Sequence, residues 1–333
     1  MGRYPFLAQA RKYLETVGNI YAEATVKELD RRLRRTSRDL QSLKEKGLID
    51  TTDPKKMGEK EVSAYMKLLR SRGLSENGQR HSITAMRAVL LFCGNPIVDK
   101  MRMQYRPMFP KERSKRYPPL DKKDVDAIQQ KAEEAVEWRE IEAFAVVILA
   151  LDSGLRNKEL RLAKVSDLDA TSWTVVVRHP KGEGRYGQQR TVAVLPPGRS
   201  FLRRYLVKRT EMVTRYAPTN EALFPALGDK SDGYFSENKL LALKNVVERK
   251  TGVKLDFRAC RRTYAQTCLD RGANVESVSL LLGHSSTRTT ESHYCRRRED
   301  TAIREVLDLF DHETPRVAEK PLIEREEYLS GYA

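Results

Sequence analysis

The sequence contains no long hydrophobic run, and this absence excludes one large class of proteins. No apolar stretch reaches the length of a bilayer-spanning helix, and the N-terminus carries no signal-peptide pattern. A composition with 32% charged residues also argues against a membrane protein. We therefore expect a soluble, cytoplasmic protein that has no membrane partner.

Cysteine is scarce, and the cysteines present are not arranged to bind a metal. The sequence has four, without a C-x-x-C pair and without histidine at zinc-finger spacing. We expect free, mostly buried thiols in a reducing compartment, with no structural zinc, no other metal and no cofactor. These residues are Cys93, Cys260, Cys268 and Cys295.

Basic residues, in contrast, are abundant. The chain has 62 lysines and arginines against 46 acidic residues, which gives a formal net charge of +16 and a pI near 9.6. Such an excess indicates a polyanionic partner. The length of 333 residues exceeds that of one ordinary domain, and 40% hydrophobic residues suffice for two cores. We expect two domains.

Residues 1–104 are predicted to form a helical N-terminal domain. Between 24 and 46, apolar residues recur at helical spacing on one stripe. Two further helices are expected at 59–72 and from Ser75 to Gly94. The other faces of the first helix are basic; in an isolated helix they would be solvated, but in so basic a chain we interpret them as phosphate contacts. The basic residues are Arg31, Arg32, Arg34, Arg35 and Arg38.

Residues 105–119 have the composition of an interdomain linker. The segment YRPMFPKERSKRYPP combines prolines with basic residues and lacks an apolar period. Four of its side chains are candidates to follow a DNA backbone, namely Lys111, Arg113, Lys115 and Arg116. Leu120 and Asp121 then form a predicted staple and cap that open a second domain, 120–313. The charged tail, 314–333, should be loosely ordered.

The second domain combines a buried helix with a β-hairpin. Residues 141–154 are apolar on nearly every face, which predicts a central helix that ends at its glycine. A new helix then starts at Arg156. Stretches rich in valine and threonine, 172–178 and 191–195, predict two strands joined by a glycine-rich turn with Lys181 at its tip.

The segment 256–294 brings several reactive side chains together. A first helix sets Arg258 and Arg261 one turn apart on one face. A second helix, opened by an asparagine cap and closed by a glycine, leaves His284 on a corner. A short last helix ends at Tyr294.

These side chains suit the attack of a tyrosine hydroxyl on a phosphodiester. Arginine binds phosphate through two parallel hydrogen bonds and never loses its charge, so it stabilises the extra negative charge of a pentacoordinate phosphorane. This chemistry needs no metal. Taken one at a time, Arg156 could merely pair with Glu159, and Lys181 could be a solvated charge.

Three segments, in order, resemble the motifs of the tyrosine recombinases of the Xer and phage-integrase type. LDSGLRNKELRLAKVSDLD resembles their first-arginine motif, VVVRHPKGEGRYGQQRTVAVLP their hairpin with a catalytic lysine, and RACRRTYAQTCLDRGANVESVSLLLGHSSTRTTESHY their C-terminal signature. The resemblance implies a mainly α protein with a small β-sheet or hairpin in its C-terminal domain, and two domains that clamp DNA. With Glu159 as a buttress, it implies as catalytic residues Arg156, Lys181, Arg258, Arg261, His284 and the nucleophile Tyr294.

Two positions depart from the family pattern. Arg258 stands where many members have histidine or lysine, which keeps a phosphate ligand but changes the proton donor. Tyr294 lies ten residues after His284, where nine is commoner, so His293 occupies the usual position of the tyrosine. We keep Tyr294 as the predicted nucleophile because Tyr264 belongs to the arginine helix and the other tyrosines nearby lie in the tail.

The resemblance implies site-specific DNA recombination through a 3′-phosphotyrosyl intermediate, without metal or ATP. The partner would be a double-stranded recombination site, bound by a homo-tetramer that passes through a Holliday junction, and the free protein could be monomeric. Such a protein would be associated with the nucleoid. A helix at 300–310 would pack on its own domain or, as in the family, on a neighbouring protomer. Two alternatives stay open: a type IB topoisomerase-like nicking-closing enzyme, and a catalytically silent DNA-binding protein with the same fold.

Overall fold

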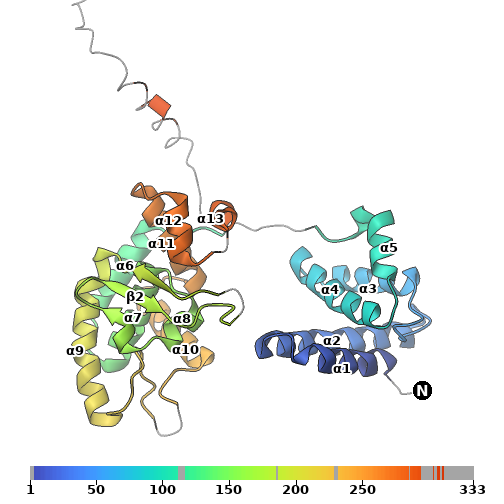
Figure 1. Cartoon of the computed structure of the whole chain (residues 1–333), viewed down its shortest axis with the longest axis horizontal. Helices are drawn as coiled ribbons and strands as arrows, with labels where there is room; N and C mark the ends of the chain where they lie inside the picture. The colour runs from blue at the N-terminus through green and yellow to red at the C-terminus, as the bar shows by residue number, and fades with distance from the viewer. Residues whose placement is uncertain are drawn as a thin grey trace, which may run out of the picture. The chain divides into compact units, whose positions relative to one another are not determined.

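The computed structural model describes residues 4–111, 117–184, 187–228, 232–284 and 286–293, with Ile303, Val306, Leu307 and Phe310. The chain divides into two compact units, Met1–Lys115 and Arg116–Ala333, each with its own hydrophobic core (Figure 1). Both units are built mainly of helices, and the second also contains a small antiparallel sheet. The fold class predicted from the sequence is confirmed.

The N-terminal unit is helical throughout its described part. Its elements are α1 (Pro5–Gly18), α2 (Glu23–Glu45), α3 (Glu59–Ser71), α4 (Glu76–Phe92), α5 (Ile97–Gln104) and the 3-10 turn η1 (Arg106–Met108). The apolar stripe predicted for α2 faces the core, where Leu33, Leu40 and Leu43 are buried. Ser75 caps α4 by accepting a hydrogen bond from the Gly78 backbone N–H (3.2 Å).

Both ends of the predicted linker are packed. Phe109 is buried in the N-terminal core, and the Arg102 guanidinium lies over its ring. In the C-terminal unit, Arg262 donates a hydrogen bond to the Pro118 carbonyl (3.0 Å). The cap predicted at Asp121 is wrong in one respect: the residue directly precedes the next helix, but its side chain makes no capping hydrogen bond.

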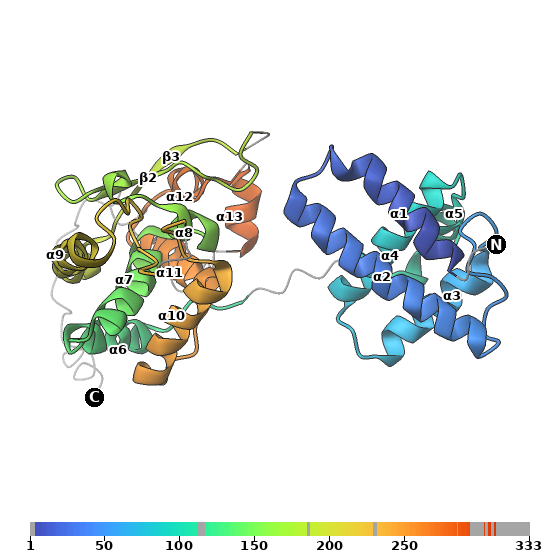
Figure 2. The same ribbon diagram turned by 90° about the horizontal axis from the view of Figure 1, so that it is seen from below.

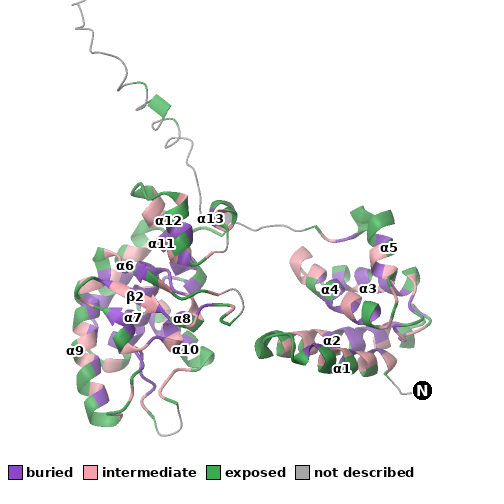
Figure 3. Cartoon of the chain, viewed as in Figure 1, coloured by how far each residue is buried: buried purple, intermediate pink, exposed green. Residues whose placement is uncertain are grey.

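Helix α7 (Trp138–Ser153) is the centre of the C-terminal unit. All its residues from 141 to 153 are buried (Figure 3), as the predicted central helix requires. It ends at Gly154, whose φ of +64° disfavours a side chain, and a Cβ there would lie 2.8 Å from the Tyr264 ring. The helices packed around it are α6 (Lys122–Glu133), α9 (Arg199–Tyr216), α10 (Glu237–Thr251) and α11 (Phe257–Asp270).

An antiparallel sheet of three strands, β1 (Leu168–Asp169), β2 (Thr174–Val177) and β3 (Arg190–Ala193), contacts α7 through β3. Val175 lies opposite Val192, and both are buried in the core. The two predicted strands are present but shorter than expected. The first strand was not predicted, because two residues are too few to show an alternating pattern.

Three consecutive helices carry much of the predicted site: α11, α12 (Val275–Leu282) and α13 (Thr287–His293). Asp256 caps α11 by accepting from the Ala259 N–H (2.6 Å), and Asn274 caps α12 by accepting from the Ser277 N–H (2.7 Å). As predicted, α12 ends at Gly283, in a left-handed conformation with φ +64°. Strand β3 runs beside α12 (Figure 2).

Some predicted features lie outside the described residues. They are Tyr294, Arg113, Lys115, Arg116, Cys295 and the tail 314–333. Four residues of the helix predicted at 300–310 are described; they are helical and 52–63% exposed, namely Ile303, Val306, Leu307 and Phe310.

The structure can be compared with the expectations for cysteine and for membrane-spanning helices. Cys260 is buried as a free thiol, whereas Cys93 and Cys268 are free and half-buried. Among the described residues, no helix is both long enough and apolar enough to cross a membrane.

Candidate active site

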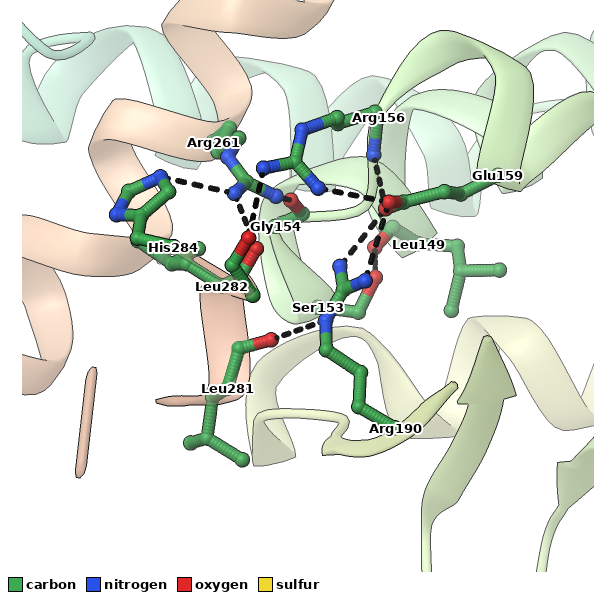
Figure 4. A network of polar contacts seen from close by, with 11 residues as sticks. Leu149, Ser153, Gly154, Arg156, Glu159, Arg190, Arg261, Leu281, Leu282 and His284 are labelled. Atoms are coloured by element: carbon green, nitrogen blue, oxygen red, sulfur yellow. Dashed lines mark hydrogen bonds and ion pairs between the residues drawn. The ribbon is translucent and has the colours of Figure 1, made fainter. Parts of the chain in front are cut away.

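Three arginines that are distant in sequence meet at the C-terminal end of α12 (Figure 4). Each donates to one of three successive backbone carbonyls: Arg190 to Leu281 (2.7 Å), Arg261 to Leu282, and Arg156 to Gly283 (3.2 Å). The last carbonyls of a helix lack partners within the helix and lie at the negative end of its dipole, so they attract cations. The end of α12 therefore gathers the guanidinium groups in one place.

Arg156 precedes α8 (Asn157–Leu162) and is held by Glu159. The Glu159 carboxylate accepts from the Arg156 backbone N–H (2.9 Å) and from its Nη1 (2.8 Å). Arg190 binds the same carboxylate with both nitrogens of its fork (3.1 and 2.8 Å). Burial acts to raise the pKa of Glu159, but the hydrogen bonds and charges of Arg190 and then Arg156 outweigh it and lower the pKa. The two arginines thus share one ionised, buried carboxylate.

Arg261 is buried, with 5% of its surface exposed. Its Nη1 donates to the Gly154 carbonyl at the end of α7 (2.8 Å), and its Nη2 contacts both the Leu282 carbonyl and His284 Nε2 (3.1 Å). Contacts from several directions fix the plane of the guanidinium, as bidentate phosphate binding requires.

His284 follows the end of α12 and is hydrogen-bonded at both ring nitrogens. Nε2 faces Arg261 Nη2 (3.1 Å), and Nδ1 faces the hydroxyl of Thr290 on α13 (2.8 Å). A guanidinium can only donate, so Nε2 accepts and the proton of the neutral ring lies on Nδ1, directed at Thr290. In this tautomer, His284 orients Arg261.

Two predicted catalytic residues form no hydrogen bond or ion pair with this cluster in the described part of the chain. Lys181 is exposed in the turn between β2 and β3, where His179 contacts Glu183 (3.0 Å). Arg258 lies one turn before Arg261, as predicted, but it is exposed and forms no hydrogen bond or ion pair within the described part of the chain. The two predicted catalytic arginines of α11 therefore lie in different environments, because the face that carries Arg261 is buried and Arg258 is exposed.

Tyr264 is excluded as the nucleophile by its surroundings. It is fully buried in α11, and its hydroxyl donates to the Ala193 carbonyl (3.2 Å). Burial also raises the pKa of this phenol. A phenol so enclosed cannot attack a DNA phosphate. Tyr294 directly follows α13 in the sequence and is outside the described residues.

The five arginines predicted on α2 fall into two groups. Three have an acidic partner one turn earlier on the helix: Arg31 and Arg32 pair with Glu28, and Arg34 pairs with Asp30. Arg35 and Arg38 are exposed and have no ion-pair partner among the residues that the structure describes. These two remain available for an external anion.

Lys111 belongs to a second basic surface of the N-terminal unit. It is exposed and lines a pocket of about 820 Å³. Other basic side chains that line this pocket are Arg80, Arg102 and Arg106. A concave basic surface of this kind suits a phosphate backbone.

The sequence did not predict a role for Arg190 or Thr290. Arg190 lies on the same face of β3 as Val192, which is buried, and the pattern continues to the buried Val194 just after the strand. A charged residue at an inward-facing strand position indicates a buried partner, so this signal was present in the sequence. No comparable signal marks Thr290, whose contact with His284 depends on the turn between α12 and α13.

The cluster has the chemistry of an anion site. Among the residues that the structure describes, one buried carboxylate, that of Glu159, faces these three guanidinium groups, so positive charge is in excess. Within the described ranges, no three histidine, cysteine or acidic side chains gather in a way that could hold a metal ion. Fixed N–H donors of this kind bind a phosphate and stabilise additional charge on its oxygens.

Known DNA recombinases are similar to this chain in sequence or in fold. A family model described as the phage integrase family matches residues 118–300, more than half of the chain. Tyrosine recombinase XerA of Pyrococcus furiosus is 26% identical over 228 residues, which cover 68% of this chain and 72% of that protein. XerA of Saccharolobus solfataricus is 28% identical over 192 residues, covering 57% and 56%. A crystal structure of XerH site-specific recombinase bound to difH substrate shares the fold, with a TM-score of 0.65, 13% identity, and coverage of 93% of this chain and 98% of that one.

Proposed function

The chain belongs to the phage integrase family, and on that premise we propose that it is a site-specific DNA recombinase acting through a 3′-phosphotyrosyl intermediate. The observation that carries the proposal is the convergence of Arg156, Arg261 and His284 at the end of α12 (Figure 4). Two oriented guanidinium groups match the non-bridging oxygens of one phosphodiester. The proposed reaction uses neither a metal nor ATP.

In this reaction the Tyr294 hydroxyl attacks the scissile phosphorus. A bond forms between the tyrosine oxygen and phosphorus as the tyrosine hydroxyl gives up its proton. The bond from phosphorus to the 5′ oxygen breaks, and that oxygen takes up a proton and leaves as a hydroxyl. The phosphotyrosyl ester retains the energy of the original bond. A 5′ hydroxyl from another strand can therefore reverse the step and complete an exchange.

Arg156 and Arg261 are proposed to hold the non-bridging oxygens in the transition state. Side-chain contacts of Arg156 with Glu159 and Gly283 occupy two N–H groups. A guanidinium has about five, so others remain for a phosphate. Loss of one such donor in comparable sites lowers the rate by about 10²- to 10³-fold.

Three further residues complete the proposed mechanism. Lys181, exposed on its turn, serves as general acid for the leaving 5′ oxygen. His284 orients Arg261 and assists in transition-state or proton handling. Arg258, exposed on α11, adds a phosphate contact or electrostatic stabilisation.

We propose double-stranded DNA as the partner, with a catalytic domain at 120–313 and a DNA-binding domain at 1–104 joined by the linker 105–119. The exposed arginines of α2 and the basic surface at Lys111 support DNA contacts by the N-terminal domain. The proposed active assembly is a tetramer on two sites, which exchanges strands through a Holliday junction. Such a protein would be associated with the nucleoid.

Covalent trapping tests the chemistry directly. Duplexes that bind the protein are selected from a random library, and each is nicked near the cleavage position so that the released fragment diffuses away. In the presence of a metal chelator, wild-type protein should form an adduct that survives on a denaturing gel. Tyr294→Phe should bind the same DNA but form no adduct, because it lacks the attacking oxygen.

The outcomes separate the possible functions. Adduct formation that persists in Tyr294→Phe would assign the nucleophile to another residue and contradict the proposed role of Tyr294. Binding without any adduct would favour the catalytically silent DNA-binding alternative. If the adduct forms, joining of two different duplexes indicates a recombinase. Relaxation of supercoiled DNA without such joining indicates a topoisomerase-like enzyme.

A further inference from the structure

Arg190 is a largely enclosed arginine, at the start of β3, to which the proposed chemistry assigns no role. Its side chain is only 9% exposed. Its fork donates two hydrogen bonds to Glu159 (3.1 and 2.8 Å), and its Nε donates a third to the Leu281 carbonyl (2.7 Å). Three directed contacts fix the orientation of this guanidinium as well as its position.

These contacts connect Arg190 to both of the proposed phosphate-binding arginines. Its acidic partner, Glu159, also holds the backbone N–H and the guanidinium of Arg156. Its carbonyl partner, Leu281, belongs to the turn whose next two carbonyls accept from Arg261 and Arg156. A displacement of Arg190 would therefore be transmitted to both arginines through groups that they share.

Packing at Gly283 reinforces this connection. A Cβ on Gly283 would lie 3.0 Å from three atoms of the Arg190 side chain, and its φ of +64° also favours glycine. The end of α12 and the Arg190 guanidinium are thus in close contact. In a packed interior, neither can shift by much without moving the other.

The charge balance around Glu159 leads to the same conclusion, that Arg190 helps to hold Arg156 in position. The Glu159 side chain is 1% exposed, and a buried carboxylate that loses a cationic partner is strongly destabilised. Among the groups that lower the pKa of Glu159 against the effect of burial, Arg190 contributes more than Arg156. Without Arg190, Glu159 would either take up a proton or draw Arg156 more tightly to itself, and both changes would disturb the Arg156 fork.

We propose that Arg190 is a positioning residue for the strand-cleavage reaction. It fixes the shared carboxylate and the end of α12, so that Arg156 and Arg261 present their N–H groups to one phosphate. Arg190 does not touch the DNA in this arrangement. The inference rests on the proposed function, because it concerns the same phosphodiester.

The test measures the cleavage rate separately from DNA affinity. Full-length protein at saturating concentration is mixed with a selected nicked duplex, and the adduct is followed over a single turnover. Arg190→Gln should lower the rate constant by about 10²-fold, because a small displacement of a positioned group is costly. The Kd, measured in a Tyr294→Phe background, should change by less than about threefold. Arg190→Lys should give an intermediate rate, since lysine keeps the charge but not the fork.

Arg178→Gln is the matched control. Arg178 directly follows β2 in the same hairpin. It also binds a buried carboxylate, that of Asp167 (2.5 Å). Thermal unfolding should show that both glutamine variants lose stability. Only the Arg190 variant should lose cleavage rate, while Arg178→Gln stays within about threefold of wild type.

Three results would overturn the inference: unchanged cleavage in Arg190→Gln, a loss confined to Kd, or an equal rate loss in Arg178→Gln. Wild-type protein that binds its duplex and forms no adduct would overturn the proposed function, and the positioning role with it. Adduct formation by the wild-type protein therefore distinguishes failure of the positioning role from failure of the proposed function.

Discussion

The chemistry of single residues in this site depends on partners whose hydrogen-bonding roles cannot change. A guanidinium only donates and a backbone carbonyl only accepts, so Arg261 sets the direction of the hydrogen bonds around it. The His284 ring adapts: Nε2 accepts from Arg261, and Nδ1–H donates to Thr290. Thr290 is completely buried, so the ring has a dry, fixed acceptor for its proton. Arg261 thus selects the tautomer of His284, and Thr290 supports it by accepting the proton on Nδ1.

Thr290→Val should weaken the anchoring of the His284 ring, which Arg261 alone would then hold in this tautomer. Valine resembles threonine in shape but lacks the hydroxyl, so Nδ1–H loses its acceptor. We expect adduct formation to slow by about tenfold, because a misdirected imidazole no longer orients Arg261. ¹⁵N chemical shifts of labelled histidine should show Nδ1 protonated in the wild type and a weaker preference for this tautomer in the variant, because one of its two hydrogen bonds is gone.

Thr290→Ser is the control for this substitution, because it retains the hydroxyl and should restore both the tautomer and most of the rate. A wild-type His284 protonated at Nε2 would contradict the assignment, since two donors would then face each other at Arg261.

At the scale of elements, α7 organises the C-terminal unit and also carries two buried carboxyl groups, Glu142 and Asp152. Each has one carboxylate oxygen without a hydrogen-bond partner among the described residues. Burial raises the pKa of both, that of Asp152 to about 7, against the opposing effects of the Gly198 backbone and the Arg199 charge. The 3-10 turn η3 (Pro196–Gly198) approaches so closely that a Cβ on Gly198 would lie 2.3 Å from Asp152 Oδ2.

The raised pKa of Asp152 predicts that the C-terminal unit loses stability as pH rises. The folded state binds the Asp152 proton more tightly than the unfolded state, so this contribution is full below the unfolded pKa of about 4 and is lost as pH rises through about 7. Asp152→Asn keeps the neutral form at every pH. It should raise the unfolding free energy at pH 8 by about 2 to 4 kcal/mol and have little effect at pH 4.

Denaturant unfolding at several pH values, followed by a probe in the C-terminal unit, measures this effect. Glu142 acts in the same direction, so the difference between wild type and Asp152→Asn isolates Asp152. Asp169→Asn is the control: that carboxylate is exposed, and a hydrogen bond from Ser172 lowers its pKa, so it is ionised in the folded and unfolded states above about pH 5. The substitution should therefore change stability by a constant amount there, without any dependence on pH. Equal stability of Asp152→Asn and wild type at pH 8 would show that Asp152 is not buried as a neutral acid.

Elements with a strong local signal were predictable, and contacts between elements were not. Helix α7 is apolar on nearly every face, and Asn274 and Ser75 are caps whose signals lie within four residues. The site itself depends on long-range pairs: Arg190 binds a carbonyl 91 residues away, and Arg156 binds one 127 residues away. Periodicity carries no information on such pairs, so the position of Arg156 followed only from its motif.

At the scale of the whole molecule, the large positive charge is not equally available to DNA. In the N-terminal unit, the ion pairs of Arg31 and Arg34 engage their donors within α2, whereas Arg35 and Arg38 are exposed without such partners in the described structure. The sequence pattern does not distinguish these arginines, because their pairing depends on side-chain positions. Binding a phosphate with a paired arginine requires breaking an existing contact, which reduces the net gain.

The salt dependence of DNA binding should distinguish the two groups. Each phosphate contact contributes about −0.9 to the slope of log K against log salt, so Arg35→Ala with Arg38→Ala should reduce the magnitude of the slope by about 2. Arg31→Ala with Arg34→Ala removes the same formal charge but should reduce it by less than about 1. Titration of a labelled nonspecific duplex at several salt concentrations measures both slopes. Equal slopes for the two double variants would show that net charge, and not the pairing seen in α2, determines the contacts that this unit makes with DNA.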